Sequence, residues 1–138
     1  MSIGGQIPTM HLKWTISHAD KLVEAFASGH VSLQDIERYL DDVMVSEALP
    51  YRKLFDASQA ASGPTDEEMM LLGARLSAYS GSGRKLGPIA IVASADVIRQ
   101  QAKLFATLAP ADRPLKIFKA VEAARKWLAT ATSGTTQA

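Results

Sequence analysis

The residues best suited to phosphoryl or acid–base chemistry gather in one stretch, Tyr51–Met70, which reads YRKLFDASQAASGPTDEEMM. Asp56 offers a carboxylate, and Ser58, Ser62 and Thr65 offer hydroxyls. A phosphate on one of these hydroxyls would add nearly two negative charges and so make or break a partner contact. The same residue types also form ordinary turns and helix caps. The stretch is therefore either a regulatory site or the connection between a buried strand and the next helix.

Asp56 also invites comparison with receiver domains, in which an aspartate accepts phosphate. Asp56, Ser94 and Lys119 each lie at or just after the end of a predicted strand, as the receiver's Asp, Ser or Thr, and Lys do. That chemistry needs Mg²⁺, which is a hard cation held by an acidic pair near the end of the first strand. Neither Ile16–Ser17 nor Phe26–Ser28 contains an acid. We therefore expect the Asp56 carboxylate to accept loop N–H groups instead.

Other catalytic and metal-binding chemistries lack the residues they need. The chain has no cysteine, which excludes thiol catalysis and cysteine-ligated metals. His11, His18 and His30 do not have the spacing of zinc ligands. Gly81–Gly87 is glycine-rich, but it follows a predicted helix and precedes a strand, the reverse of a phosphate-binding P-loop. We expect no catalytic residues, no metal, no cofactor and no enzymatic activity.

Charge and hydropathy exclude further classes of protein. A net charge of +1 over 138 residues argues against nucleic-acid binding, which requires a concentrated basic surface. The longest apolar run, Leu86–Ala93, is too short to cross a bilayer, so we predict no transmembrane segment. The N-terminus has no positively charged segment followed by an apolar one, which argues against a signal peptide. With the absence of cysteine, these features favour a cytoplasmic protein.

Hydrophobic periodicity predicts five strands and four helices. The predicted strands are His11–Ser17, Asp20–Ser28, Tyr51–Ala57, Leu86–Ala93 and Leu115–Lys119, and the predicted helices are Val31–Met44, Thr65–Tyr79, Ser94–Leu108 and a last segment ending near Ala129. A helix is the competing interpretation of Asp20–Ser28. The order β-β-α-β-α-β-α-β-α indicates an α/β fold. We expect a mostly parallel five-stranded sheet with right-handed crossovers, four helices and an antiparallel N-terminal hairpin.

Capping residues indicate where the first three helices begin. Ser32–Asp35 and Thr65–Glu68 have the positions of a helix N-cap and its third residue, and Ser94 is the predicted cap of the third helix. The inward face of that third helix is apolar and includes Ile98, Ala102 and Phe105. If this helix moved outward, it could open a pocket for a ligand.

The element order and two short motifs resemble the STAS family, the fold of bacterial anti-sigma-factor antagonists. The motifs are Lys53–Ser58, a strand ending in Asp-Ala-Ser, and the C-terminal set Lys116–Phe118, Glu122–Ala124 and Trp127–Leu128. The chain is similar in particular to small free-standing STAS-like bacterial proteins, which are grouped near the CRAL-TRIO lipid-binding fold. The resemblance covers residues 10–130, which we expect to form one STAS-like domain. Residues 1–9 and 131–138 are expected to be flexible ends.

The resemblance implies a phosphorylation switch, with one departure. In the antagonists, an Asp-Ser-Ser/Thr-Gly sequence follows the Asp-small-Ser strand, and a partner kinase phosphorylates its serine. The corresponding stretch here is Ala61–Thr65, in which Ser62 and Gly63 are kept and Ala61 replaces the aspartate. Ser62 and Thr65 are thus candidate phosphoacceptors, and a STAS-like scaffold with an altered or lost switch is the alternative. An anti-sigma-factor-like kinase or another regulator would be the protein partner.

Two functional hypotheses follow. The first is a non-enzymatic, cytoplasmic, STAS-like interaction or regulatory module, whose partner surface is the Asp56–Thr65 loop with the helix after it. The second is a small-molecule or lipid carrier of CRAL-TRIO-like fold, gated by the helix bearing Ile98, Ala102 and Phe105, with peripheral lipid contact.

Overall fold

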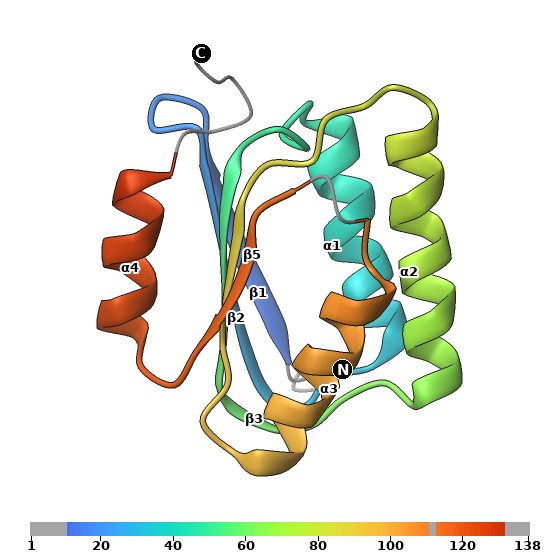
Figure 1. The fold of residues 1–138 in the computed structure, drawn as a ribbon, viewed down its shortest axis with the longest axis vertical. Coiled ribbons are helices and arrows are strands. Elements are labelled where there is room, and N and C mark those ends of the chain that lie inside the picture. Colours follow the sequence, from blue (N-terminus) through green and yellow to red (C-terminus); the bar gives the residue numbers. More distant parts are fainter. Residues whose placement is uncertain (1–10, 111–112, 132–138) are drawn as a thin grey trace, which may run out of the picture.

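The computed structural model describes residues 11–110 and 113–131, in which helices cover both faces of a central sheet (Figure 1). The strands are β1 (Leu12–Ser17), β2 (Leu22–His30), β3 (Arg52–Ser62), β4 (Ile89–Val92) and β5 (Leu115–Phe118), and the helices are α1 (Leu33–Val45), α2 (Asp66–Gly81), α3 (Asp96–Leu108) and α4 (Val121–Thr130). The predicted element order is confirmed, including the strand interpretation of Asp20–Ser28. The expected flexible ends lie outside the described residues, except for Ala131.

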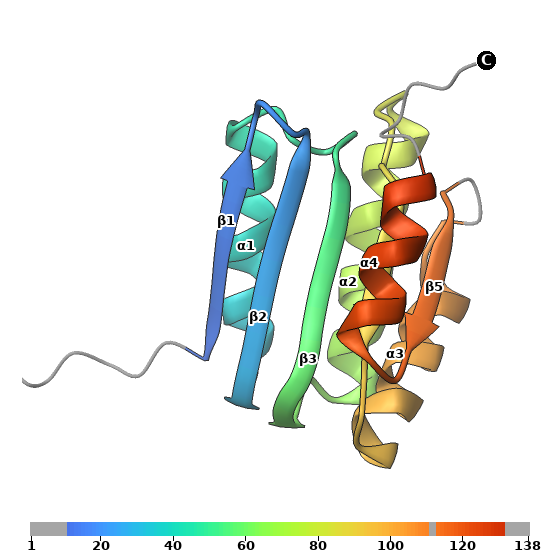
Figure 2. The same ribbon diagram turned by 90° about the vertical axis from the view of Figure 1, so that its left-hand side faces the viewer.

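The strands are ordered as they occur in the sequence, from β1 to β5. β1 pairs with β2 antiparallel, and every other neighbouring pair is parallel. The three crossovers from β2 to β5 therefore all step in the same direction across the sheet. Because parallel crossovers are right-handed, this topology places α1, α2 and α3 together on one face. α4, which follows the last strand, covers the other face (Figures 1 and 2).

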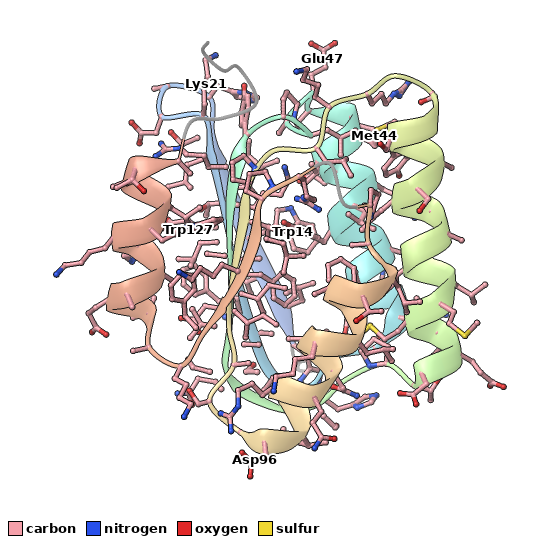
Figure 3. All side chains as sticks on the ribbon, in the orientation of Figure 1. Trp14, Lys21, Met44, Glu47, Asp96 and Trp127 are labelled. Carbon is pink, nitrogen blue, oxygen red and sulfur yellow. The ribbon has the colours of Figure 1, made fainter. Side chains whose placement is uncertain are left out.

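Two apolar layers hold the helices to the sheet. The larger one lies between the sheet and α1–α3, and it includes Trp14 (Figure 3). The smaller one lies under α4, which packs on β3, β4 and β5, and it includes Trp127. All four residues of β4 are buried, as expected for a central parallel strand covered on both faces.

The helix starts follow the predicted caps in two of three cases. The Ser32 hydroxyl accepts from Asp35 N–H while the Asp35 carboxylate accepts from Ser32 N–H, and Thr65 and Glu68 form the same reciprocal pair. The prediction for Ser94 was wrong. α3 begins at Asp96 after Ala95, without a side-chain cap. Ser94 Oγ instead donates to Lys119 O at 3.3 Å, because the packing of β5 beside β4 brings that carbonyl within reach.

β3 is longer than predicted, which changes the setting of the candidate stretch. It continues from Arg52 to Ser62, so Asp56 and Ser58 lie within a strand and not in a loop after it. β2 continues to His30 and supplies backbone partners for the added length, pairing His30 with Ser62. Small residues such as Ala60 gave no periodic signal in the sequence, so only the neighbouring strand shows that the ladder continues.

Candidate functional site

Asp56 and Ser58 form a β-bulge. The register shifts between the pair Phe26–Asp56 and the pair Ser28–Gln59, so β3 has one residue more than β2 at this point. A bulge leaves a backbone N–H unpaired, and here Asp56 Oδ1 accepts from Ser58 N at 3.0 Å. The Asp-Ala-Ser motif therefore has a structural role in bending the strand.

The four candidate residues of this stretch do not converge on one site. Leu54 belongs to the apolar layer under α4, so strand alternation places Asp56 on the α4 face of the sheet. Ser62, half-buried, lies on the opposite face, and its Oγ is 2.7 Å from His30 Nδ1. Thr65 is exposed and caps α2. A phosphate on Ser62 would thus have to displace the His30 contact, whereas Thr65 would lose its capping role.

A cavity of about 120 Å³ lies between the sheet and helices α1, α2 and α3. This is comparable to cavities that hold a small aromatic molecule. Its walls are mostly apolar and come from all three helices, from β3 and from β4. Ile98, Ala102 and Phe105, the predicted gating residues, are all among its lining residues. The apolar face of α3 thus forms one wall of a ligand-sized space.

Along β3, the cavity extends over most of the strand. Its lining includes the alternating residues Lys53, Phe55 and Ala57 and, beyond the bulge, Ala60 and Ser62. With a rise of about 3.3 Å per residue, this spans roughly 30 Å between the Lys53 and Ser62 positions. The lining residues therefore follow the length of β3, with Lys53 near its start and Ser62 at its end.

Lys53 is the first polar residue at the end where β3 begins. Its side chain is only 3% exposed, and Nζ donates to Leu49 O and to Tyr51 O, the latter at 2.8 Å. Burial lowers the pKa of Lys53 well below its ordinary value, and the positive charge of Arg113 lowers it further. The ammonium group therefore tends to lose its proton in this setting.

Arg113 and Tyr39 complete this polar end of the cavity. Arg113 is 7% exposed, and its Nε donates to Gly87 O at 2.9 Å. Tyr39, from α1, has a buried hydroxyl without a hydrogen-bond partner in the part of the chain that the structure describes. Burial raises the pKa of Tyr39, an effect that the Arg113 charge partly offsets. The Arg113 charge therefore acts on both Lys53 and Tyr39 at this end of the cavity.

The opposite end is closed by a contact between α3 and the loop before α2. Gln101 Nε2 donates to Pro64 O at 2.9 Å. A Cβ on Gly63 would lie 2.7 Å from Gln101 Oε1, so glycine allows the loop to approach the helix. Further along α3, a Cβ on Gly73 would lie 2.9 Å from Leu108 Cβ. α3 is thus packed tightly on α2 at its C-terminal end, and nearer its start the Gln101–Pro64 hydrogen bond ties it to the loop before α2.

Tyr39, Lys53 and Arg113 were not among the predicted site residues. Tyr39 lies three residues after Ile36 and four before Val43, so the apolar stripe of α1 does predict that it is buried. Strand alternation likewise places Lys53 on the face of Phe55 and Ala57. Arg113 gave no signal, because it follows a loop whose path the sequence does not specify.

The fold and topology define a STAS-like α/β protein. The chain belongs to the SpoIIAA-like family, whose model matches residues 22–129. A solved structure with a SpoIIAA-like fold, an uncharacterised DUF3478-family protein from Shewanella loihica PV-4, is 15% identical in sequence. The match covers 85% of this chain and 93% of that one, with a TM-score of 0.56, and at this identity it shows the fold alone. No curated protein matches the sequence.

Across residues 11–110 and 113–131, no group of three or more His, Asp or Glu side chains is placed to hold a metal ion. None of the helices in this part of the chain combines the length and apolar character needed to span a membrane.

Proposed function

We propose that this protein is a non-enzymatic, cytoplasmic binding module that holds a small apolar compound between its sheet and helices α1–α3. The observation that carries the proposal is the cavity itself, about 120 Å³ in volume and lined mostly by apolar side chains. Native cores are usually packed without voids of this size. An unfilled apolar space is costly because its walls lose van der Waals contacts, and a ligand would restore them.

α3 is the element that admits the ligand. It supplies Ile98, Ala102 and Phe105 to the cavity, and beyond its start the Gln101–Pro64 hydrogen bond ties it to the loop before α2. One neutral hydrogen bond contributes only about 1 kcal/mol, so the Gln101–Pro64 bond can break at little cost. The tight contact of Gly73 with Leu108 would act as the fixed end of the movement.

Filling the cavity tests the proposal. Native mass spectrometry of protein purified from its host should detect a bound compound, and the neutral fluorescent probe N-phenyl-1-naphthylamine should bind to the emptied protein. Ala102→Leu adds three carbons to a side chain that lines the cavity, so it should weaken probe binding at least tenfold. Ala74→Leu, on the exposed face of α2, is the matched control and should leave binding unchanged. Probe binding that is equal in the two variants would place the probe elsewhere and overturn the proposal.

A protein-interaction role is the second candidate, and exposed apolar residues on α2 favour it. Met70 is 59% exposed and Leu71 62% exposed, directly after the acidic first turn of the helix. Together with Thr65 and Ser62, they would form the partner surface. Pull-down with mass spectrometry should recover a partner that Met70→Glu or phosphorylation at Thr65 releases. Recovery of no partner, or of one that ignores both changes, argues against this role.

A further inference from the structure

The Tyr39 hydroxyl is a polar group of the cavity lining whose partner is missing. It is buried, and it has no hydrogen-bond partner among residues 11–110 and 113–131. The other polar side chains of the lining are hydrogen-bonded within the protein: Lys53 to Leu49 O and Tyr51 O, Arg113 to Gly87 O, Ser62 to His30, and Gln101 to Pro64 O. Because buried hydroxyls are almost always hydrogen-bonded, a bound molecule is expected to supply the missing partner.

The surroundings of Tyr39 favour the donor role for its hydroxyl. Edge-on contacts with Trp14 at 5.6 Å and with Phe55 at 5.9 Å between centroids hold the ring, so packing sets the position of the hydroxyl. Burial raises the pKa of Tyr39, and the Arg113 charge offsets this only in part, so the hydroxyl keeps its proton at neutral pH. A protonated phenol has one hydrogen to donate. The occupant of the cavity therefore has to present an acceptor.

A water molecule fits this position poorly. Buried waters typically make about three hydrogen bonds to otherwise unsatisfied polar groups. In the described chain, the Tyr39 hydroxyl is the one buried side-chain group that is left to bond. An organic acceptor needs only this bond, and its carbon atoms fill the apolar remainder of the space.

The acceptor is expected to be uncharged and to bring no donor of its own. An ion is costly to bury without a counter-charge. Burial lowers the pKa of Lys53 and so favours its neutral form, and Arg113 is hydrogen-bonded within the protein. No Asp or Glu is among the lining residues in the described chain, so a cation would be uncompensated as well. An alcohol or a primary amide would add an O–H or N–H that the apolar walls leave unpaired.

We propose that the ligand is a compact, uncharged apolar compound with one hydrogen-bond acceptor and no donor, such as a ketone, whose oxygen accepts from the Tyr39 hydroxyl. This inference rests on the proposed binding function, because it names the ligand class for the same cavity. The volume of about 120 Å³ limits the ligand to the size of a small ring. A dry cavity of about 150 Å³ is known to hold benzene.

A ketone and its hydrocarbon counterpart test the inference. Cyclohexanone and methylenecyclohexane have nearly the same shape, but only the ketone carries an acceptor. Both are titrated by NMR into the wild type, Tyr39→Phe and Tyr79→Phe, each freed of ligand by unfolding and refolding. Tyr39→Phe should lower the affinity for cyclohexanone relative to methylenecyclohexane about fivefold or more, through the loss of one hydrogen bond. Tyr79→Phe removes a hydroxyl that is not part of the described lining, so the affinity ratio should stay at its wild-type value.

Two further measurements use the wild type alone. The carbonyl stretch of bound ¹³C-labelled cyclohexanone should lie at lower frequency than in an alkane solvent, because a hydrogen bond weakens the C=O bond. Cyclohexanecarboxylate should bind more weakly than cyclohexanone, because it carries a charge.

The outcomes separate this inference from the proposed function. An affinity ratio unchanged in Tyr39→Phe, an alkane-like carbonyl stretch, or tighter binding of the carboxylate would overturn the inference while the cavity remained a binding site. Failure of both cyclic compounds to bind would also overturn it. If the fluorescent probe does not bind either, the proposed function fails as well.

Discussion

The three tyrosines of the chain test how the cavity is built, because only the Tyr39 hydroxyl lacks a hydrogen-bond partner among the residues that the structure describes. Tyr39→Phe removes the orphan hydroxyl and keeps the ring against Trp14 and Phe55. Burying a hydroxyl without a hydrogen bond costs about 1–3 kcal/mol in proteins. The ligand-free variant should therefore be more stable than the wild type by about that amount, although most core substitutions destabilise.

The other two tyrosines are the matched controls. Tyr79 OH accepts from Arg75 Nε at 2.6 Å, and Tyr51 OH lies 2.7 Å from His18 Nδ1. Replacing either by phenylalanine breaks a hydrogen bond, so each variant should lose about 0.5–1.5 kcal/mol, with the lower values expected for exposed partners.

Urea unfolding measures all three effects. With a typical dependence of about 1–3 kcal/mol per molar urea, the Tyr39→Phe midpoint should rise by roughly 1 M while the two control midpoints fall. A ligand-free Tyr39→Phe variant that is less stable than the wild type would refute the reasoning, since the hydroxyl would then have a partner.

Three further predictions concern Lys53, Asp56 and Gly73. Between the lowered folded-state pKa of Lys53 and its ordinary value of 10.5, the unfolded chain holds a proton that the folded protein lacks. Wild-type stability should therefore rise with pH relative to Lys53→Met by about 1.4 kcal/mol per pH unit in that window, and parallel urea midpoints across pH would contradict this. Asp56→Ala should cost about 1 kcal/mol by leaving Ser58 N–H unpaired at the bulge, whereas Asp56→Asn keeps an acceptor and should cost less, as thermal unfolding can show. Gly73→Ala should destabilise by about 1–3 kcal/mol through contact with Leu108 despite its better helix propensity, and an increase in melting temperature would show that α3 yields readily there.

The C-terminal boundary of β3 shows which part of a strand local sequence patterns can predict. The apolar alternation from Lys53 to Ala57 predicted the strand, but its continuation to Ser62 depends on pairing with β2. Similarly, Ser94 has the residue type of a cap, yet β5 brings the Lys119 carbonyl to its hydroxyl. Such competition between local and tertiary partners cannot be evaluated without knowing which strands are neighbours.

The candidate site was likewise predicted only in part from the sequence. The apolar face of α3 was predicted from spacing, and Ile98, Ala102 and Phe105 do line the cavity. The polar end was not predicted, because Tyr39 and Lys53 come from separate elements and Arg113 follows a loop. Each of these residues alone resembles an ordinary surface or core position.

The sequence by itself determined the order of the elements, the mostly parallel sheet and two capped helices, because periodicity and caps act within a few neighbouring residues. Only the tertiary structure decided that Asp56 and Ser62 lie on opposite faces of the sheet. It also decided that Tyr39, Lys53 and Arg113 meet at one end of an apolar cavity. The physical reason is that burial, charge proximity and an unpaired hydroxyl are properties of the packed arrangement, and no single segment carries them.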